Sequence, residues 1–249
     1  MKKRVVVLTD CIDVAWQEIR GSIYSNCSNY DVCIEPVVPV DSYNIVNVNF
    51  LVKLIAEIYP EGTIICVIVN PLKLRTERIV GKTKRKHIIF EGTNTGAFSW
   101  LVNDFECEEL YELYDPGFIP FGGKYVHAPA VGKIASGIPI NELGDNFALD
   151  KIRHVKMEKG TIMHVDNFGN LKLFHKFEEE PKNGDKFLIQ FSNKLEVTYN
   201  KRMMEKEDGD LVIYPGSSFG YTEIGIVRDH FSSKYNVKIG DVIKIKKVN

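Results

Sequence analysis

A chain of 249 residues is long enough to bury one large hydrophobic core or two smaller ones, and two cores are the better fit. Charged residues make up 26% of the chain but nearly cancel to a formal net charge of −1, which excludes a bulk attraction to nucleic acid or to an anionic membrane. No stretch reaches the ~20 apolar residues that a membrane helix needs, and the apolar run after Met1 ends too early for a signal peptide, so we expect a cytoplasmic protein.

Residues 1–146 are predicted to form an α/β domain. Short apolar runs predict strands, and segments whose apolar residues recur three and four positions apart predict helices. The expected strands cover residues 4–9, 63–69 and 86–90, and the expected helices cover 13–25, 44–59, 97–102 and 129–136. Strands that are apolar throughout and separated by helices are typical of a largely parallel sheet.

Two further features of the composition limit the function. The basic run from Lys82 to His87 fits a solvated hairpin tip better than a phosphate-binding patch. The five cysteines are odd in number and show no CxxC spacing, so we predict neither a zinc site nor a disulfide framework. No metal is expected.

The pattern changes after residue 146. Residues 147–158 are polar and irregular, as in a linker between domains. From residue 159 to 249 the apolar runs are short and turn signals are frequent, among them Asn183-Gly184-Asp185 and Pro215-Gly216-Ser217. Regularly spaced turns of this kind predict an all-β domain, an antiparallel β-barrel or sandwich.

The stretch from His164 to Leu171 carries the strongest functional signal. It follows an apolar strand-like run and places a carboxylate, an aromatic ring and an amide in one tight bend, at Asp166, Phe168 and Asn170. Gly169 permits a close backbone approach. This set could hold a small ligand that has an amine and a flat base, although Asp166 and Asn170 could also form a local Asx-type turn, and Phe168 could belong to the core.

A second group of polar residues follows the predicted parallel strands. Ligands of such sheets bind beyond the carboxyl ends of the strands. Asp10 follows the first strand and is well placed to bind a ribose diol, while Asn70 follows the third strand at the same edge. Asp13 opens a helix and is either part of this site or the N-cap of the helix.

Several short motifs follow one another along nearly the whole chain, and their order and spacing match those of a known protein family. They are Leu8-Thr9-Asp10, Arg20-Gly21, Tyr59-Pro60-Glu61-Gly62-Thr63, Gly92-Thr93-Asn94-Thr95-Gly96, Ala128-Pro129, Ile134-Ala135-Ser136-Gly137, Glu142-Leu143-Gly144, His164-Val165-Asp166, Phe168-Gly169-Asn170, Gly216-Ser217-Ser218 and Glu223-Ile224. In these motifs the chain resembles the S-adenosylmethionine (SAM) hydroxide adenosyltransferases, in the same superfamily as the SAM-dependent fluorinase and chlorinase.

The resemblance implies an α/β N-terminal domain, a β-barrel C-terminal domain and a homotrimer. It also implies that SAM is a substrate or ligand, with no separate cofactor, and that it binds between the N-terminal domain of one subunit and the C-terminal domain of the next. By position, Asp10 would hold the ribose hydroxyls and Asp13 would support that corner.

The resemblance also assigns roles in the C-terminal domain. Asp166 would pair with the methionine ammonium group, and Ser217 and Ser218 would face the methionine carboxylate. Phe168 and Asn170 would hold the adenine by packing and hydrogen bonds.

The positions that activate water in the family are changed here. The aspartate position holds Asn70, the arginine position aligns with Glu77 next to Arg78, and the histidine position holds Gly122. An amide cannot act as a base at neutral pH. His127 lies five positions further on, and we interpret it as a partnered, partly buried histidine in preference to a relocated base.

The chain does not copy the halogenases either, because Lys73, Gly122 and Gly123 stand where their halide pocket has threonine and serine. Whether Lys73, Arg75 or Arg78 enters the site is left open by the sequence. Three hypotheses follow: a SAM hydrolase that gives adenosine and methionine, a non-catalytic trimer that binds SAM or a related nucleoside, and an enzyme that acts on another substrate with the same nucleoside grip.

Overall fold

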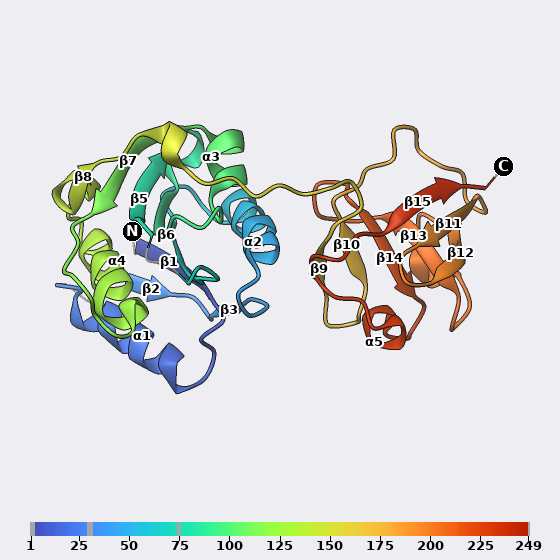
Figure 1. The fold of residues 1–249 in the computed structure, drawn as a ribbon, viewed down its shortest axis with the longest axis horizontal. Helices are drawn as coiled ribbons and strands as arrows, with labels where there is room; N and C mark the ends of the chain where they lie inside the picture. Colours follow the sequence, from blue (N-terminus) through green and yellow to red (C-terminus); the bar gives the residue numbers. More distant parts are fainter. Residues whose placement is uncertain (1–2, 29–31, 74–75, 249) are drawn as a thin grey trace. The chain divides into compact units, whose positions relative to one another are not determined.

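The chain divides into two compact units, residues 1–155 and 156–249. The structure is a computed structural model that describes residues 3–28, 32–73 and 76–248 (Figure 1). Each unit has its own hydrophobic core. A mixed α/β chain of two domains is therefore confirmed.

The N-terminal unit is built on one mixed sheet. Its strands are β1 (Lys3–Thr9), β2 (Val32–Ile34), β3 (Val38–Pro39), β4 (Ile64–Ile68), β5 (Arg78–Thr83), β6 (Ile89–Thr93), β7 (Cys107–Leu113) and β8 (Gly144–Asn146), in the order β2-β1-β4-β6-β5-β7-β8 with β3 also on β1. Strands β1 to β4 and β6 pair in parallel, whereas β5, β7 and β8 pair antiparallel. The sheet is thus parallel on one side only, and the antiparallel strands β5 and β7 were not expected from the sequence.

In the described part of this unit, four α-helices cover the two faces of the sheet. They are α1 (Val14–Ser25), α2 (Ile45–Ile58), α3 (Ser99–Phe105) and α4 (Ala128–Ala135), and the shorter helical turns are η1 (Arg85–His87), η2 (Gly123–His127), η3 (Ile140–Glu142) and η4 (Leu149–Lys151). Helices α1 and α4 pack side by side on one face, and α2 and α3 lie on the other (Figure 1). The Asp13 carboxylate accepts a hydrogen bond from the Ala15 backbone N–H, which fixes the start of α1.

The centre of the sheet explains why its sequence is apolar without alternation. In β1, Val5 and Val7 belong to the core cluster on the face of the sheet that α1 and α4 cover. Val6 and Leu8, which alternate with them, are equally inaccessible to solvent. Successive side chains of a strand point to opposite faces, so both faces of β1 are covered. Each such side chain contributes about 1.5–3 kcal/mol to folding, and together they hold the end of β1 rigidly.

The C-terminal unit is predominantly β. Its strands are β9 (Ile162–Val165), β10 (Leu171–Leu173), β11 (Lys186–Gln190), β12 (Lys194–Tyr199), β13 (Leu211–Pro215), β14 (Thr222–Ile226) and β15 (Lys244–Lys247), with the helical turn η5 (Met203–Glu205) and the short helix α5 (Phe231–Tyr235). The order is β15-β11-β12-β13-β14-β10-β9, and β12 with β13 is the one parallel pair among them. An isolated β-bridge pairs Thr161, just before the edge strand β9, with Val242, just before the other edge strand β15. The two edges of the sheet therefore come together, and the sheet curls upon itself.

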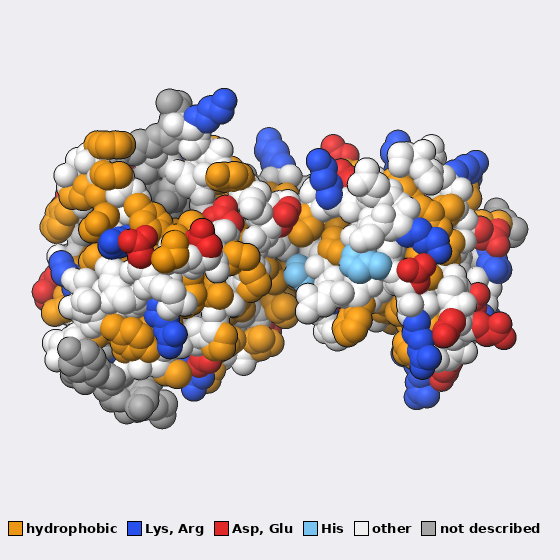
Figure 2. All heavy atoms as spheres, turned by 90° about the horizontal axis from the view of Figure 1, so that it is seen from below, with side chains coloured by type: hydrophobic (Ala, Val, Ile, Leu, Met, Phe, Trp, Pro, Cys, Tyr) orange, Lys and Arg blue, Asp and Glu red, His pale blue; other side chains and the backbone are white. Residues whose placement is uncertain are grey.

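The basic run from Lys82 to His87 lies in a hairpin, as the sequence predicts. The basic run forms the tip of the β5–β6 hairpin, and two of its lysines pair with neighbouring acids, Lys84 with Glu106 at 2.9 Å and Lys82 with Glu108 at 3.0 Å. Acidic and basic side chains are interspersed on the face shown in Figure 2. All five cysteines are free thiols. Within the described residues, no helix has the length and apolar character needed to cross a bilayer.

Candidate functional site

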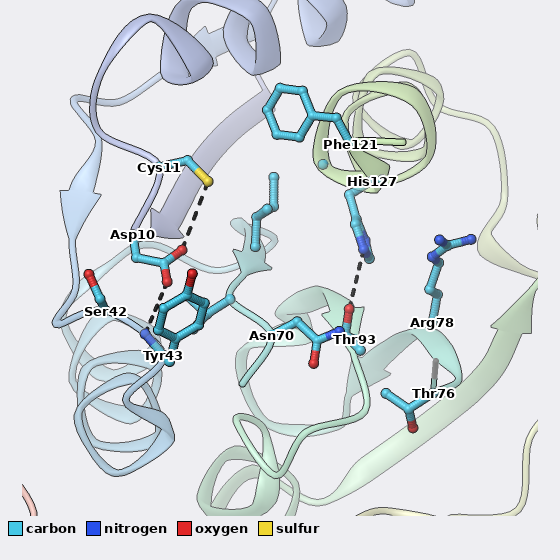
Figure 3. Close-up of a pocket in the computed structure, with 14 residues that line it drawn as sticks. Asp10, Cys11, Ser42, Tyr43, Asn70, Thr76, Arg78, Thr93, Phe121 and His127 are labelled. Atoms are coloured by element: carbon cyan, nitrogen blue, oxygen red, sulfur yellow. Dashed lines mark hydrogen bonds between the residues drawn. The ribbon is translucent and has the colours of Figure 1, made fainter. Parts of the chain in front are cut away.

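The N-terminal unit has a cavity of about 380 Å³ at the carboxyl ends of its parallel strands. Asp10 follows β1, Asn70 follows β4 and Thr93 ends β6, so three neighbouring strands each deliver a polar side chain to this edge. The cavity is lined by Asp10, Cys11, Ser42, Tyr43, Ile68, Val69, Asn70, Thr76, Arg78, Thr93, Phe121, Gly122, Gly123 and His127 (Figure 3).

Asp10 is held in the cavity wall with part of its carboxylate unused. Its Oδ2 accepts a hydrogen bond of 3.0 Å from the Tyr43 backbone N–H, and its Oδ1 lies 3.9 Å from the Cys11 Sγ. The second distance is too long for a strong bond, so Oδ1 is available to a ligand hydroxyl. Tyr43 itself has a φ of 57°, a left-handed conformation that is rare for an aromatic residue. Such strain is concentrated at functional sites.

The other two N-terminal candidates have different surroundings. Asn70 lines the cavity, and its Oδ1 accepts a 2.9 Å hydrogen bond from the Leu72 backbone N–H. Asp13 is exposed, caps α1 and is not among the residues that line the cavity. The geometry therefore shows the capping role of Asp13, and its ligand role stays a prediction.

Arg78 brings a positive charge to the cavity wall. It is largely buried at the start of β5, lies against Gly122 and approaches the Asp115 carboxylate at 3.8 Å. The neighbouring Glu77 instead accepts a hydrogen bond of 2.6 Å from Thr76 Oγ1, and this bond lowers the pKa of Glu77. Arg78 therefore lines the cavity, and Glu77 is not among its lining residues. Lys73 is exposed outside it, and Arg75 lies outside the described residues.

A buried cluster stands on the same side of the cavity as Arg78. The His127 Nδ1 lies 2.5 Å from Glu91 Oε1, and the His127 Nε2 lies 3.3 Å from Thr93 Oγ1. Figure 3 shows Thr93 and His127 across the cavity from Asp10 and Tyr43. His127 is only 4% exposed and Glu91 is fully buried, as expected for a partnered histidine.

In the C-terminal unit, Asp166 organises its own loop. Its Oδ1 accepts from the backbone N–H groups of Phe168 and Asn170, both at 2.9 Å, and its Oδ2 accepts from Asn170 Nδ2 at 3.1 Å. The Asx-type turn is therefore present. Oδ2 keeps lone pairs that could still accept from an ammonium group, so the ligand role of Asp166 stays a prediction.

Phe168 and Asn170 line a second cavity, of about 570 Å³. Phe168 is 76% exposed, which argues against a simple core role, and the other lining residues include Met203, Met204 and Ile226. Asn170 is only 8% exposed, and its Oδ1 is a buried oxygen without a hydrogen-bond partner in the described part of the chain. A buried acceptor beside an apolar wall suits the amine and the ring of a flat base.

Ser217 and Ser218 lie in the hairpin connection between β13 and β14 and are not among the residues that line this second cavity. Beside that connection, Glu223 pairs with Lys172, and burial together with Glu223 strongly raises the pKa of Tyr214. The serines remain predicted contacts of a carboxylate.

The comparison with known sequences gives the family. The profile of the SAM hydroxide adenosyltransferase N-terminal domain matches residues 5–144, and that of the SAM hydroxide adenosyltransferase C-terminal domain matches residues 160–244. The chain belongs to the SAM hydroxide adenosyltransferase family. The resemblance drawn from the sequence motifs is thereby confirmed.

Individual relatives of this SAM hydroxide adenosyltransferase family member are distant. The (R)-S-adenosyl-L-methionine hydrolase of Methanocaldococcus jannaschii is 22% identical over 216 residues, which cover 83% of this chain and 80% of the relative. An uncharacterized conserved protein from Thermotoga maritima has the same fold, with a TM-score of 0.81, 21% identity and coverage of 97% of this chain and 99% of the other. A conserved hypothetical protein from Thermus thermophilus gives a TM-score of 0.78, 16% identity and coverage of 98% and 100%.

The sequence interpretation did not find every lining residue of this family member. Tyr43 and Phe121 reach the cavity from irregular segments, both with positive φ, and no local pattern marks them. Glu91 carries a signal that could have been used, since it is a lone carboxylate after the apolar run Ile88-Ile89-Phe90. A charge in a buried strand requires a partner, and that partner is His127.

Proposed function

We propose that this protein hydrolyses SAM to adenosine and methionine. The observation that supports this most directly is the Asp10 carboxylate, fixed by the Tyr43 backbone in the wall of the cavity at the carboxyl edge of the parallel sheet. A carboxylate in this position suits the paired hydroxyls of a ribose. Binding the ribose there would place C5′ inside the same cavity, close to its polar wall.

The two cavities fit different parts of SAM. At about 380 Å³, the N-terminal cavity is near the lower end of the ~300–1,000 Å³ usual for ligand sites, which suits a ribose and its substituent better than the whole molecule. The apolar C-terminal cavity, with the unpaired Asn170 Oδ1, suits adenine. In the proposed homotrimer, a C-terminal unit of one subunit would complete the ribose cavity of another.

Water is the nucleophile that suits this cavity. A halide reacts after desolvation in a small apolar pocket, whereas the wall here presents Arg78, Thr93 and the imidazole of His127. Neutral water attacks poorly and needs a group that takes its proton. A wall with an imidazole can meet that need.

A non-catalytic SAM or nucleoside binder is the alternative. It is favoured by one observation, the amide of Asn70 at the position where the family resemblance implies a carboxylate. Asn70 has no proton-accepting function at neutral pH, so hydrolysis requires another group.

Incubation of the purified protein with SAM separates these functions. Adenosine is quantified by liquid chromatography and mass spectrometry, with Asp10→Ala as the control. Adenosine formed by the intact protein and abolished by the substitution supports hydrolysis. SAM binding without adenosine would refute hydrolysis and favour the binder, and absence of SAM binding would point to another substrate. Light scattering tests the homotrimer, which requires three times the 28.4 kDa of one chain.

A further inference from the structure

Glu91 is a carboxylate in the middle of the N-terminal core. It lies on β6, it is fully buried, and its register partner on β4 is Cys66. Burying a carboxylate is costly unless it is paired. Its partners are His127 Nδ1 at 2.5 Å and Cys66 Sγ at 3.2 Å, so an imidazole and a thiol take the place of the usual lysine or arginine.

The strand geometry aims this cluster at the cavity. Glu91 and Thr93 are two residues apart on β6, so their side chains lie on the same face of the sheet. The imidazole of His127 spans them, with Nδ1 at Glu91 and Nε2 at Thr93 Oγ1. Glu91 is behind the cavity wall, while Thr93 and His127 are part of it.

The hydrogen-bond pattern selects one form of the imidazole. A carboxylate can only accept, so the proton of a neutral His127 lies on Nδ1 and is donated to Glu91. Nε2 is then an acceptor for the Thr93 hydroxyl. Burial and the neighbouring Glu91 raise the pKa of the Cys66 thiol well above its usual range, so Cys66 stays an S–H donor to the same carboxylate.

We propose that Thr93, His127 and Glu91 form the proton-accepting group for the attacking water, in place of the family residues changed at Asn70 and Gly122. This inference rests on the proposed hydrolysis of SAM. Thr93 Oγ1 contacts the water, His127 Nε2 receives the proton, and Glu91 orients the ring and stabilises the imidazolium. Cys66 is a positioning residue, because it acts through Glu91.

Atoms and electrons balance in the proposed step. The water oxygen forms a bond to C5′ of the ribose, and the C5′–S bond breaks with its electron pair going to the sulfonium sulfur of SAM. The products are adenosine and methionine. One water proton passes to Thr93 Oγ1 while the Thr93 hydroxyl proton passes to His127 Nε2, from which it is later released to solvent. Attack by Thr93 itself would leave an ether on the protein and no adenosine.

The pH dependence follows from the proton-accepting role. His127 accepts a proton only when it is unprotonated, so we expect kcat to fall on the acid side of the pH profile. The titratable groups that face His127 are Glu91 on β6, Cys66 on β4 behind Glu91, Arg78 on β5, and Asp10, Cys11 and Tyr43 across the cavity. The Asp10→Asn variant therefore serves to separate the ionisation of Asp10 from that of His127.

The experiment measures kcat, SAM affinity and melting temperature for the full chain and its variants. We expect His127→Gln and Glu91→Gln to lower kcat by about 10²- to 10⁴-fold, which is the usual contribution of a general base. SAM affinity should stay within about threefold of the wild-type value. Thr93→Val should lower kcat at least about tenfold, and Thr93→Ser, which keeps the hydroxyl, should restore it. The matched control is His87→Gln, since His87 is half exposed on η1 and is not among the lining residues of the cavity.

Four results would overturn the proposal. A folded His127→Gln protein with at least about a third of the wild-type kcat would overturn the proton relay, while wild-type turnover preserves the proposed function. If His127→Gln fails to fold, two other measurements decide. Equal kcat values for Thr93→Val and Thr93→Ser would overturn the proton relay, and so would a wild-type pH profile of kcat that does not fall at low pH. A wild-type protein that binds SAM and forms no adenosine would refute the proposed function and the relay together.

Discussion

The charge of Asp10 should account for a large part of nucleoside affinity, which can be tested by replacing it with asparagine. Asparagine keeps an oxygen for the Tyr43 N–H bond of 3.0 Å, so the fold of the loop is preserved. It removes the negative charge of the carboxylate, whose Oδ1 has a long contact of 3.9 Å with Cys11 Sγ among the described residues. The substitution therefore isolates the contact with the ligand.

The expected magnitude follows from one charge-assisted hydrogen bond. Such a bond contributes about 1.5–3 kcal/mol, equivalent to a loss of affinity of roughly 10- to 150-fold. Isothermal titration with adenosine measures the effect, because adenosine is the expected product and is not consumed. Circular dichroism confirms that the variant is folded.

Asp13→Asn is the matched comparison, since it removes the same charge three residues away. Asparagine caps helices as well as aspartate does, so α1 should be retained. We expect adenosine affinity within about twofold of wild type, since the capping carboxylate lies outside the cavity lining. Equal affinity losses for the Asp10→Asn and Asp13→Asn variants would refute the assignment of ribose binding to Asp10 alone and would place Asp13 in the site.

Three further predictions concern stability and thiol chemistry. Asp13→Ala should cost about 1 kcal/mol in urea denaturation, because the cap of α1 is lost. Gly169→Ala should be destabilised by at least about 1 kcal/mol more than the control Gly220→Ala. Both glycines have positive φ, but a Cβ at Gly169 would lie 2.2 Å from His230 Nδ1, whereas a Cβ at Gly220 would meet open space. Equal urea midpoints for the two variants would contradict this prediction. Burial raises the pKa of Cys107 from 9.0 to about 11. Alkylation of this thiol at pH 8, followed by mass spectrometry, should therefore be about 100-fold slower in the native than in the urea-unfolded protein, and it should speed up towards pH 11. Equal alkylation rates in the native and unfolded protein would refute the burial argument.

The elements that could be predicted are those with a strong local pattern. The helix expected at 44–59 is α2 (Ile45–Ile58), and the strand expected at 63–69 is β4 (Ile64–Ile68), because each has its own apolar period and its own turn. Strand β7 was missed because Glu108, Glu109 and Glu112 interrupt its apolar residues. Those carboxylates belong to a strand near the edge of the sheet, where Glu108 and Glu109 pair with Lys82. This contact forms only in the folded chain.

In the candidate site, too, some residues could be predicted from the sequence and others depend on the folded structure. Asp10 could be predicted because a polar residue directly after a buried strand must lie at the sheet edge. His127 could be identified as a partnered histidine, but its partner Glu91 is 36 positions away and its place in the cavity wall depends on how η2 packs. The pairing of distant residues across strands is set by tertiary packing, which no local period encodes. The roles given to Asp166, Ser217 and Ser218 stay predictions.

The position of β1 in the sheet has a consequence for how the protein is made. This strand is synthesised before its partner β4, because Thr9 lies 59 residues before its neighbour Ile68. At about 5–20 residues per second, the ribosome needs roughly 3–12 s to produce the missing partner. During that interval the run Val5-Val6-Val7-Leu8 has one open strand edge, which makes it a binding site for chaperones and a nucleus for aggregation. Chains stalled between α1 and β4 should therefore be insoluble, and Asp10 reaches its final position only after β4 has left the ribosome.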